Sequence, residues 1–367
     1  SQTLFHCYYA TILIMPNFYI NTDKKLLNIS DDLLQSTSLG VDTEFIREST
    51  YFPKLALIQF STKHNNYIID TQTITSKSLL VDILTDDRKL KVLHSAKQDL
   101  ETIHRYFECF PNNIFDTQIA FNLISTLMNP SYSSLVKKYF SVDLKEGSWR
   151  TDWLKRPLSD EKIEYAANDV KYLIDLSSNL REEVSKLNRL DWLEEEHINE
   201  LSLRKIIIDP FDAWNKITIP INLDSKQRSN VRSIAAWREV EAKNTDIPKK
   251  WILTDGEIIK LACAKVELIN SILDKTKNKM SDSYKDNIAM LLKQNKKNNQ
   301  PVKQIDMNSY NKKINQCNTL LMKISEEQQI SPSLIANKRD IDYFARGQED
   351  IKFLKGWRFK IFGKLVQ

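Results

Sequence analysis

The chain has 367 residues, of which 41% are hydrophobic and 28% charged. At about 100–200 residues per domain this length indicates two or three domains, and the apolar content excludes a disordered chain. The longest apolar stretch, Tyr8 to Met15, is far shorter than the about 20 residues of a membrane helix. No basic residue precedes Lys24, so no secretory signal is expected either. We expect Met15 to be the natural start and residues 1–14 to be an upstream extension.

The cysteines and the charges bound the function further. The 4 cysteines are scattered and form no CxxC pair, so neither a zinc site nor a disulfide framework is predicted, and a reducing, cytoplasmic setting is expected. Residues 1–200 carry 22 Lys and Arg against 29 Asp and Glu, whereas residues 201–367 carry 31 against 19. This asymmetry indicates an acidic unit joined to a basic one. Basic domains often bind polyanions, although many basic faces are only solvated.

Residues 15–205 are predicted to alternate between strands and helices. Short apolar runs rich in Val, Ile and Phe predict strands, the first three of them as an antiparallel meander, at Gly40–Ile46, Leu55–Ser61, Tyr67–Asp70 and Lys91–His94. Helical spacing of apolar residues predicts helices at Gln98–Phe107, Asp116–Met128 and Ser133–Phe140, and a long one at Ser159–Leu190.

After about Asp209 the strand signals fade and helices dominate. An amphipathic helix is predicted at Ser225–Asn244, with one apolar side formed by Val231, Ile234, Ala235 and Val240. Thr254–Glu257 is a capping box that opens another helix. The polar segment Asn295–Pro301 is predicted to be a linker, and residues 308–367 a last small helical unit.

The first acidic cluster is Asp42 and Glu44, on the first predicted strand. Successive strand side chains point to opposite faces, so these two carboxylates share a face. Two carboxylates side by side repel each other, and a cation between them would remove the cost. A strand with one wet face is the plainer interpretation, and both remain open on this cluster alone.

Two further clusters follow along the chain. Asp99 lies where the predicted strand that ends at His94 gives way to a helix, and its plainer interpretation is a first-turn acid favoured by the helix dipole, which is common. His94 is either a substrate contact or a structural histidine. In the long helix, the i,i+4 spacing places Tyr165 and Asp169 on one face, a pairing that also occurs by chance.

The combination is more specific than any of its parts. Four carboxylates from three separated segments can converge on two divalent cations, and hard oxygen ligands suit Mg²⁺ or Mn²⁺. Two such cations about 4 Å apart can clamp the attacking and leaving oxygens of a phosphoryl displacement. A tyrosine beside them can orient or deprotonate the attacking water.

The order and local sequence of these motifs resemble the DEDD family of 3′→5′ exonucleases, in its tyrosine-bearing subgroup. The stretches that carry the resemblance span most of residues 38–190 and read VDTEF (41–45), YFPKLALIQ (51–59), LHSAKQDLE (93–101), FDTQIA (115–120), RTDWLKRPLS (150–159) and YAANDVKYL (165–173). One departure lies in the second motif, where Ser95-Ala96-Lys97 replaces an expected small residue such as Gly followed by a polar one.

The resemblance implies a ribonuclease H-like α/β exonuclease domain with a mixed sheet, and roles for its residues. It implies that two divalent cations, Mg²⁺ or Mn²⁺, are held by the carboxylates of Asp42, Glu44, Asp99 and Asp169. It implies that Tyr165 positions the nucleophilic water. It places three residues near the 3′-terminal nucleotide, namely Thr43, Phe45 and His94. Phe45 can stack on the terminal base, although a core position explains it nearly as well.

The segment Arg150–Pro157 carries three basic side chains and Trp153, with two interpretations. It either touches the substrate backbone, or Trp153 and Pro157 anchor the start of the long helix.

The basic half resembles a second known module, the helical HRDC domain. The carrying residues are Phe211-Asp212-Ala213-Trp214, residues 229–248 and Trp251–Asp255, and residues 331–336 with Gly356-Trp357-Arg358 are traces of a second, divergent copy. The expected domains are 15–205 for the exonuclease, 208–295 for the first all-α bundle and 300–367 for the second. The resemblance implies nucleic-acid binding by these bundles, with Lys296, Lys297 and Lys352–Lys360 as candidate backbone contacts; helices that only pack on the nuclease are the alternative.

We therefore expect a two-metal 3′–5′ exonuclease and, by default, a monomer; the resemblance implies that its substrate is RNA, which makes it an exoribonuclease. The resemblance implies that it trims 3′ ends of structured RNA, such as tRNA precursors, and releases nucleoside 5′-monophosphates. A DNA exonuclease, a nucleic-acid-binding protein with an inactive nuclease fold and a protein-interaction scaffold are the alternatives. The intact set of four carboxylates with Tyr165 argues against an inactive fold.

Overall fold

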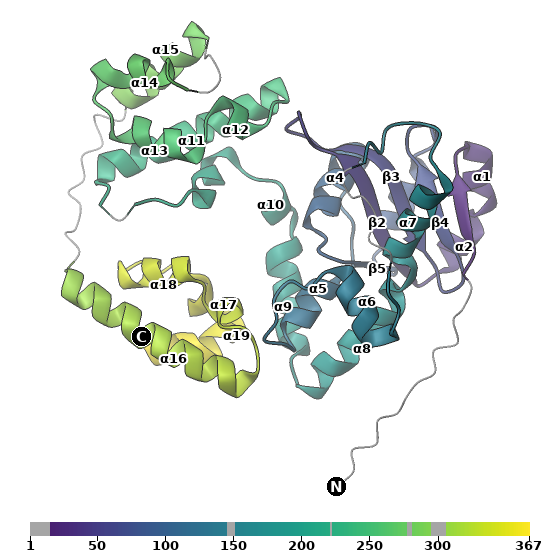
Figure 1. The fold of residues 1–367 in the computed structure, drawn as a ribbon. Helices are drawn as coiled ribbons and strands as arrows, with labels where there is room; N and C mark the ends of the chain where they lie inside the picture. Colours follow the sequence, from purple (N-terminus) through teal and green to yellow (C-terminus); the bar gives the residue numbers. More distant parts are fainter. Residues whose placement is uncertain (1–14, 145–150, 221, 277–280, 295–305) are drawn as a thin grey trace. The chain divides into compact units, whose positions relative to one another are not determined.

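The computed structural model describes residues 15–144, 151–220, 222–276, 281–294 and 306–367 (Figure 1). The expected extension at residues 1–14, Arg150, the linker Asn295–Pro301 and Lys296 and Lys297 lie outside the described residues. The chain divides into two compact units. Unit 1 takes its described residues from Ser1–Ile46, Leu55–Ser202 and Met307–Gln367, and unit 2 takes them from Arg47–Lys54 and Leu203–Asp306. No helix within the described ranges is long and apolar enough to cross a membrane.

Unit 1 is built on a six-stranded sheet with the strand order β1-β4-β3-β2-β5-β6. The strands are β1 (Asn17–Ile20), β2 (Ser38–Ile46), β3 (Lys54–Ser61), β4 (Asn66–Asp70), β5 (Leu90–Leu93) and β6 (Ile114–Asp116). The β3–β4 pair is antiparallel, as the predicted meander requires, whereas β1–β4, β2–β5 and β5–β6 are parallel. The expected mixed sheet is therefore confirmed, and the sequence patterns missed its two short edge strands.

Nine helices, α1 to α9, lie between or after the strands in the described sequence of unit 1 up to Leu201 and flank the sheet (Figure 1). They are α1 (Asp23–Asn28), α2 (Ser30–Gln35), α3 (Ser78–Thr85), α4 (Lys97–Phe107), α5 (Thr117–Asn122), α6 (Tyr132–Phe140), α7 (Asp160–Lys171), α8 (Leu173–Lys186) and α9 (Leu190–Leu201). The predicted helix at Asp116–Met128 is therefore too long, since α5 ends at Asn122.

The prediction of one long helix at Ser159–Leu190 is wrong, because two breaks divide it. The backbone N–H of Tyr172 donates to the hydroxyl of Tyr132, 3.0 Å away, at the junction of α7 and α8. Asn188 has a left-handed φ of 56° between α8 and α9, and a guanidinium N–H of Arg189 donates to the carbonyl of Leu123 at 2.6 Å. Both breaks depend on tertiary partners, which local propensity does not register.

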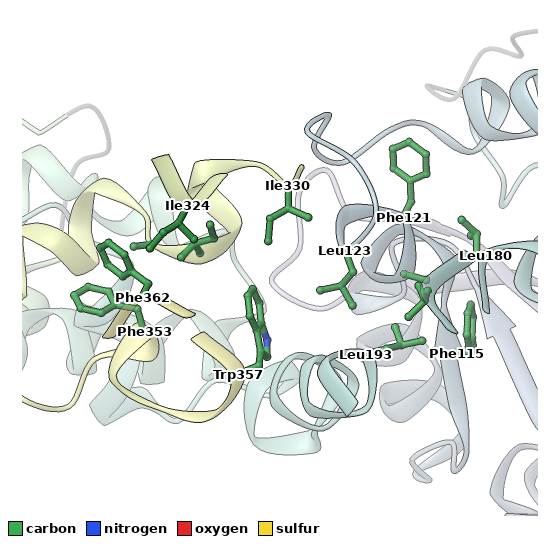
Figure 2. Close-up of a cluster of buried hydrophobic side chains, with 14 of the residues drawn as sticks. Phe115, Phe121, Leu123, Leu180, Leu193, Ile324, Ile330, Phe353, Trp357 and Phe362 are labelled. Atoms are coloured by element: carbon green, nitrogen blue, oxygen red, sulfur yellow. The ribbon is translucent and has the colours of Figure 1, made fainter. Parts of the chain in front are cut away.

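The C-terminal segment packs into unit 1 and shares its main core. Its elements are α16 (Met307–Gln328), α17 (Pro332–Ile335), α18 (Lys338–Ala345), η4 (Lys352–Leu354), α19 (Gly356–Arg358), the π-helix η5 (Phe359–Gly363) and α20 (Lys364–Val366). One cluster of buried side chains includes Phe115, Phe121 and Leu193 together with Ile330, Trp357 and Phe362 (Figure 2). Trp357 stacks on Trp192 of α9 with ring centroids 4.3 Å apart.

A buried ion pair joins the same two segments. Glu196 of α9 is 3% exposed and accepts hydrogen bonds from Arg358 and from the indole N–H of Trp357, the latter at 3.0 Å. Lys352 lies 3.3 Å from Glu196 and 2.5 Å from Glu200. A buried carboxylate without such partners would be costly, so these contacts bind the segment specifically to α9.

From Leu203 onward, the elements of unit 2 within the described residues are all helices. They are α10 (Leu203–Ile206), η1 (Pro210–Lys216), α11 (Ser225–Thr245), α12 (Lys249–Ile252), α13 (Asp255–Cys263), η2 (Val266–Leu268), α14 (Ile269–Leu273) and α15 (Asp282–Gln294). The capping box of Thr254 and Glu257 is formed as predicted, at the start of α13. The predicted helix at Ser225–Asn244 is confirmed within one residue as α11. A second capping box opens this helix, with Asp224 as the N-cap residue and Gln227 as its partner in the first turn.

One predicted core position of α11 is wrong. Val240 is 42% exposed, whereas its neighbour Glu239 is fully buried. Glu239 accepts a hydrogen bond from the hydroxyl of Tyr51 at 2.5 Å and pairs with Lys249 at 3.1 Å. A glutamate with these partners can occupy the buried face, which hydrophobic periodicity alone does not predict.

Helix α7 approaches β2 closely at Gly40. A Cβ atom at Gly40 would lie 2.2 Å from Ser61 Oγ and 2.9 Å from the Val170 carbonyl oxygen. The hydroxyl of Ser61 donates to that same carbonyl at 2.7 Å. Gly40 precedes Asp42 by two residues and Val170 follows Asp169 directly. The absence of a side chain at Gly40 therefore sets how near these two acids can come.

We predict that Gly40→Val lowers the free energy of unfolding by about 1–3 kcal/mol, because the added side chain overpacks the contact between β2 and α7. Chemical denaturation measures the effect. Gly256→Ala is the matched control, since nothing lies within 4 Å of a Cβ at that position of α13 and alanine is the better helix former. Equal stability of Gly40→Val and the native protein would contradict the prediction.

Candidate active site

Strand β2 and helix α7 bring three acids together. Asp42 and Glu44 alternate along β2 with the buried residues Val41 and Thr43, so their side chains share a face as predicted. One carboxylate oxygen from each of Asp42, Glu44 and Asp169 lies within 4.8 Å of the other two. Periodicity predicted that Asp42 and Glu44 share a strand face and that Asp169 lies on a helix face with Tyr165. The structure brings the three acids together into one cluster.

Asp99 is the fourth predicted acid and lies in the first turn of α4. It is 8% exposed, and the hydroxyl of Thr43 donates to its Oδ1 at 2.5 Å. Its oxygens are not part of the cluster within 4.8 Å, yet its charge acts on Asp42, Glu44 and Asp169. The structure therefore places all four predicted carboxylates in one electrostatic environment.

The acids of this site resist ionisation. Burial, and then the charges of the neighbouring acids, raise the pKa of Asp42 and that of Glu44 well above their usual values. Burial raises the pKa of Asp99 and that of Asp169 to about 7. Asp99 is buried and the other three acids are half-buried, and charges of like sign so close together form a site that a bound cation would stabilise.

Tyr165 lies one helical turn before Asp169 on α7. Burial, followed by the charges of Asp169, Glu44 and Asp42, raises the pKa of the tyrosine. The side chain of Tyr165 therefore lies close enough to the acidic cluster to feel its charges, on the same helix face as Asp169, as the i,i+4 spacing predicted.

The three predicted substrate contacts are in different situations. His94 is held by the protein on both sides, since its Nδ1 lies 2.9 Å from Thr117 Oγ1 and its Nε2 lies 3.0 Å from the Pro130 carbonyl oxygen. Thr43 is buried and bonded to Asp99. Phe45 is half-buried near the end of β2. Their contact with a 3′ nucleotide stays a prediction, and the bonds of His94 favour its structural interpretation.

Asp116 is a residue whose role the sequence interpretation missed. It is 2% exposed and accepts backbone hydrogen bonds from Ala96 and Gln118 at 2.8 Å and from Ser95 and Ile119 at 3.2 Å. One carboxylate thus caps α5 and fixes the turn into α4, which carries Asp99. An Asp directly before a helix is the signal that could have predicted the cap.

The same turn lies in the stretch where the second motif departs from the expected pattern. Ser95 adopts a left-handed φ of 59°, a conformation that glycine reaches without strain. Its N–H donates a hydrogen bond to Asp116 at 3.2 Å, which helps to hold this turn.

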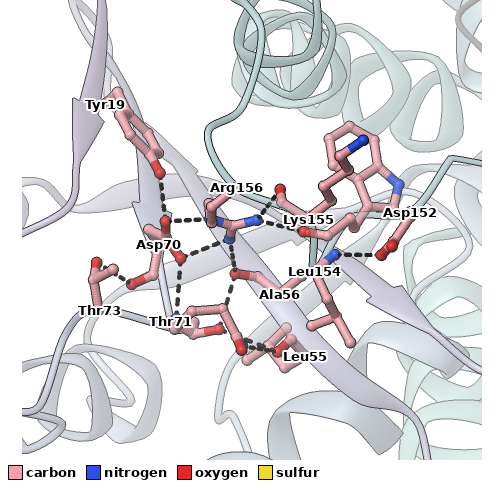
Figure 3. Close-up of polar contacts among 12 residues, drawn as sticks. Tyr19, Leu55, Ala56, Asp70, Thr71, Thr73, Asp152, Leu154, Lys155 and Arg156 are labelled. Carbon is pink, nitrogen blue, oxygen red and sulfur yellow. Dashed lines mark hydrogen bonds and ion pairs between the residues drawn. The ribbon is translucent and has the colours of Figure 1, made fainter.

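A bidentate ion pair fixes the segment before α7 (Figure 3). Arg156 Nε and Nη2 each donate to Asp70 at the end of β4 at 2.6 Å. Nη1 donates to the carbonyl oxygens of Trp153 at 2.5 Å and Lys155 at 3.0 Å, and Nη2 also donates to that of Ala56 at 3.3 Å. All five N–H groups of this guanidinium have acceptors within the protein, so for Arg156 the structure favours an anchor over a substrate contact.

The chain is similar to known proteins over nearly its whole length. Residues 17–185 match the family model described as a 3′-5′ exonuclease. Ribonuclease D of Sphingobium indicum is 31% identical over 360 residues, which cover 94% of this chain and 92% of the relative. This chain belongs to the ribonuclease D family. It is accordingly a hydrolase, a 3′–5′ exoribonuclease, and the resemblance to DEDD exonucleases is confirmed.

Ribonuclease D of Escherichia coli shows the same relation in sequence and structure. It is 28% identical over 374 residues, 95% of this chain and 96% of the relative. Its crystal structure, described as that of an exoribonuclease involved in structured RNA processing, matches with a TM-score of 0.80 at 27% identity and covers 96% of this chain and 98% of that one. The likeness therefore extends through the helical C-terminal part of the ribonuclease D fold.

We predict that Asp116→Ala lowers the free energy of unfolding by about 2–4 kcal/mol, because four backbone N–H groups lose their acceptor. Chemical denaturation at neutral pH measures this loss. Asp87→Ala, at an exposed position, is the control and should stay within about 0.5 kcal/mol of the native protein. If both variants are equally stable, Asp116 does not hold the turn before Asp99.

Proposed function

We propose that this ribonuclease D relative uses two divalent cations to remove nucleotides from the 3′ ends of structured RNA, with tRNA precursors as its substrates. The observation that carries this proposal is the approach of Asp42, Glu44 and Asp169 to within 4.8 Å of one another. The products would be nucleoside 5′-monophosphates, since the attacking water adds to the phosphorus and the RNA 3′ oxygen leaves.

The residues fit a pair of hard cations. Asp42, Glu44, Asp99 and Asp169 offer only carboxylate oxygens, the donor set that Mg²⁺ and Mn²⁺ prefer. Burial raises the pKa values of all four acids, and the charges of neighbouring acids raise those of Asp42, Glu44 and Asp169 further. A bound cation would relieve this cost of ionisation. Two divalent cations held there would supply a nucleophilic hydroxide and stabilise the charge on the leaving oxygen.

The protein's own groups then position the reactants. The hydroxyl of Tyr165, on the same helix face as Asp169, would orient the attacking water by a hydrogen bond. Phe45, half-buried on the same strand as Asp42, would stack on the 3′-terminal base. Asp116 and Arg156 keep α4 and the start of α7 in place.

The substrate class rests on the relatives. They are named ribonuclease D, and the matched crystal structure is that of an exoribonuclease involved in structured RNA processing. We extend this to the present chain, to tRNA precursors as its RNA, to a monomeric protein and to the cytoplasm, where the free thiols of Cys109, Cys263 and Cys317 would stay reduced.

Unit 2 would supply affinity for the RNA backbone. Its main segment, residues 203–306, carries 20 Lys and Arg against 13 Asp and Glu. We assign residues 208–295, in unit 2, as an HRDC-like bundle and 300–367, which from Met307 onward belongs to unit 1, as a divergent second one. Contacts of lysine and arginine with phosphates give affinity without reading sequence.

The test is a cleavage assay with the purified full chain. A 5′-labelled RNA hairpin with a single-stranded 3′ tail is incubated with Mg²⁺, with Mn²⁺ and with EDTA, beside a DNA of the same sequence. A metal-dependent ladder that shortens from the 3′ end of the RNA, absent with Asp42→Ala, supports the proposal. A ladder in EDTA contradicts metal use, and faster shortening of the DNA contradicts the RNA preference.

We predict that Asp169→Asn nearly abolishes turnover, because a cation ligand is lost. RNA binding should remain, because the lysines and arginines of unit 2 are unchanged. Single-turnover cleavage and filter binding measure the two effects. Asp175→Asn, on α8 and outside the cluster, is the matched control. Normal turnover of Asp169→Asn would remove this residue from the site.

We also predict that Tyr165→Phe lowers kcat by about 100-fold, the lower range for loss of a positioned proton-transfer group. The ring stays and only the hydroxyl is removed, so KM should change little. Steady-state kinetics at saturating Mg²⁺ separates the two constants. An unchanged kcat would assign the tyrosine to packing alone.

A further inference from the structure

Trp153 is a buried aromatic residue beside the active-site tyrosine. It is 2% exposed, and its ring centroid lies 6.0 Å from that of Tyr165 with an interplanar angle of 36°. Both rings belong to one apolar cluster with Ala56 and Ile68 of the sheet and Ala166 of α7. Trp153 therefore packs between the sheet and the helix, against the side of Tyr165.

The backbone of Trp153 is fixed independently of this packing. Its carbonyl oxygen accepts a hydrogen bond from Arg156 Nη1 at 2.5 Å. The same guanidinium is held by Asp70, which is fully buried and also accepts hydrogen bonds from the hydroxyl of Tyr19 and, at 3.0 Å, from the N–H of Gln72. Trp153 is thus attached to the end of β4 and cannot shift without breaking this network.

The indole ring is held by contacts with its faces and edges. Its Nε1 has no hydrogen-bond partner in the part of the chain that the structure describes. Lys162, in the first turn of α7, lies with its ammonium 5.6 Å from the ring and donates to the Asp152 carbonyl at 3.1 Å. The indole ring of Trp153 therefore acts through its packing contacts. One of the side chains that it packs against is Tyr165.

We propose that Trp153 is a positioning residue for Tyr165. An aromatic side chain on a helix has few χ1 rotamers, and the neighbouring ring of Trp153 selects the rotamer that keeps Tyr165 near the acidic cluster. Arg156 and Asp70 act indirectly, because they hold the backbone of Trp153 in place and Trp153 in turn contacts Tyr165. This inference rests on the proposed function only for its kinetic consequence.

Kinetics on two substitutions test the inference. Trp153→Leu removes the aromatic ring, and we expect kcat to fall about 10-fold to 100-fold with KM within twofold of the native value, because a misplaced catalytic group slows the chemical step. Trp153→Phe keeps a ring against Tyr165 and should recover most of kcat. Trp192→Phe is the control, since Trp192 stacks on Trp357 and should leave kcat unchanged.

A double-mutant cycle separates positioning from general loosening. If Trp153 acts through the hydroxyl of Tyr165, Trp153→Leu in a Tyr165→Phe background should cause no further loss of kcat. Independent, multiplicative losses would overturn the inference, and so would an unchanged kcat of Trp153→Leu. Thermal unfolding of each variant identifies a loss of activity that comes from misfolding.

A readout without activity completes the test. The crystal structure of Trp153→Leu should show the Tyr165 side chain turned away from Asp169. A Tyr165 in its native rotamer would overturn the inference. Should Trp153→Leu not fold, the structure of Arg156→Lys, which loses the donors to Trp153, takes its place with the same expected and contrary results. Inactive native protein in every metal lane would reject the proposed function, and the crystal structure would still decide this inference.

Discussion

The approach of α7 to β2 is the constraint on which the site depends. Acids of like charge repel one another, so nothing in their own chemistry would bring Asp42, Glu44 and Asp169 together. Apolar packing and one hydrogen bond do so, where the Val170 carbonyl accepts from Ser61 beside the bare backbone of Gly40. The free energy that holds the acids together therefore comes from the core beneath them.

The pKa values of two other acids of unit 1, Asp70 and Glu196, shift in the opposite direction from those of the site. Burial acts to raise the pKa of Asp70 and of Glu196, but hydrogen bonds from Arg156 and from Arg358 hold both below their usual values. In the site the same desolvation is reinforced by neighbouring acids, and the pKa values of Asp42 and Glu44 rise. At Asp70 and Glu196 an arginine neutralises the buried carboxylate, whereas in the site the charges that act on Asp42 and Glu44 are those of other acids.

Local sequence patterns predicted which site residues share a strand or helix face, but not which segments of the chain meet in the fold. Strand alternation placed Asp42 and Glu44 on one face, and helical spacing paired Tyr165 with Asp169, because both depend on neighbours along the chain. Convergence of these segments came from the resemblance to a family, since spacing says nothing of which segments meet. The break at Tyr172 depends on a hydroxyl 40 residues away, on Tyr132, and the buried Glu239 depends on Tyr51 and Lys249.

Unit 1 is discontinuous in sequence, and this has a consequence for biosynthesis. The chain leaves unit 1 after Ser202 and returns to it only at Met307. While the protein emerges from the ribosome, Glu196 is therefore made more than 150 residues before Arg358, the partner that neutralises it in the core. The nuclease unit reaches its final packing only when translation has passed Arg358, so an incomplete chain has an unfinished core and a carboxylate without its cation.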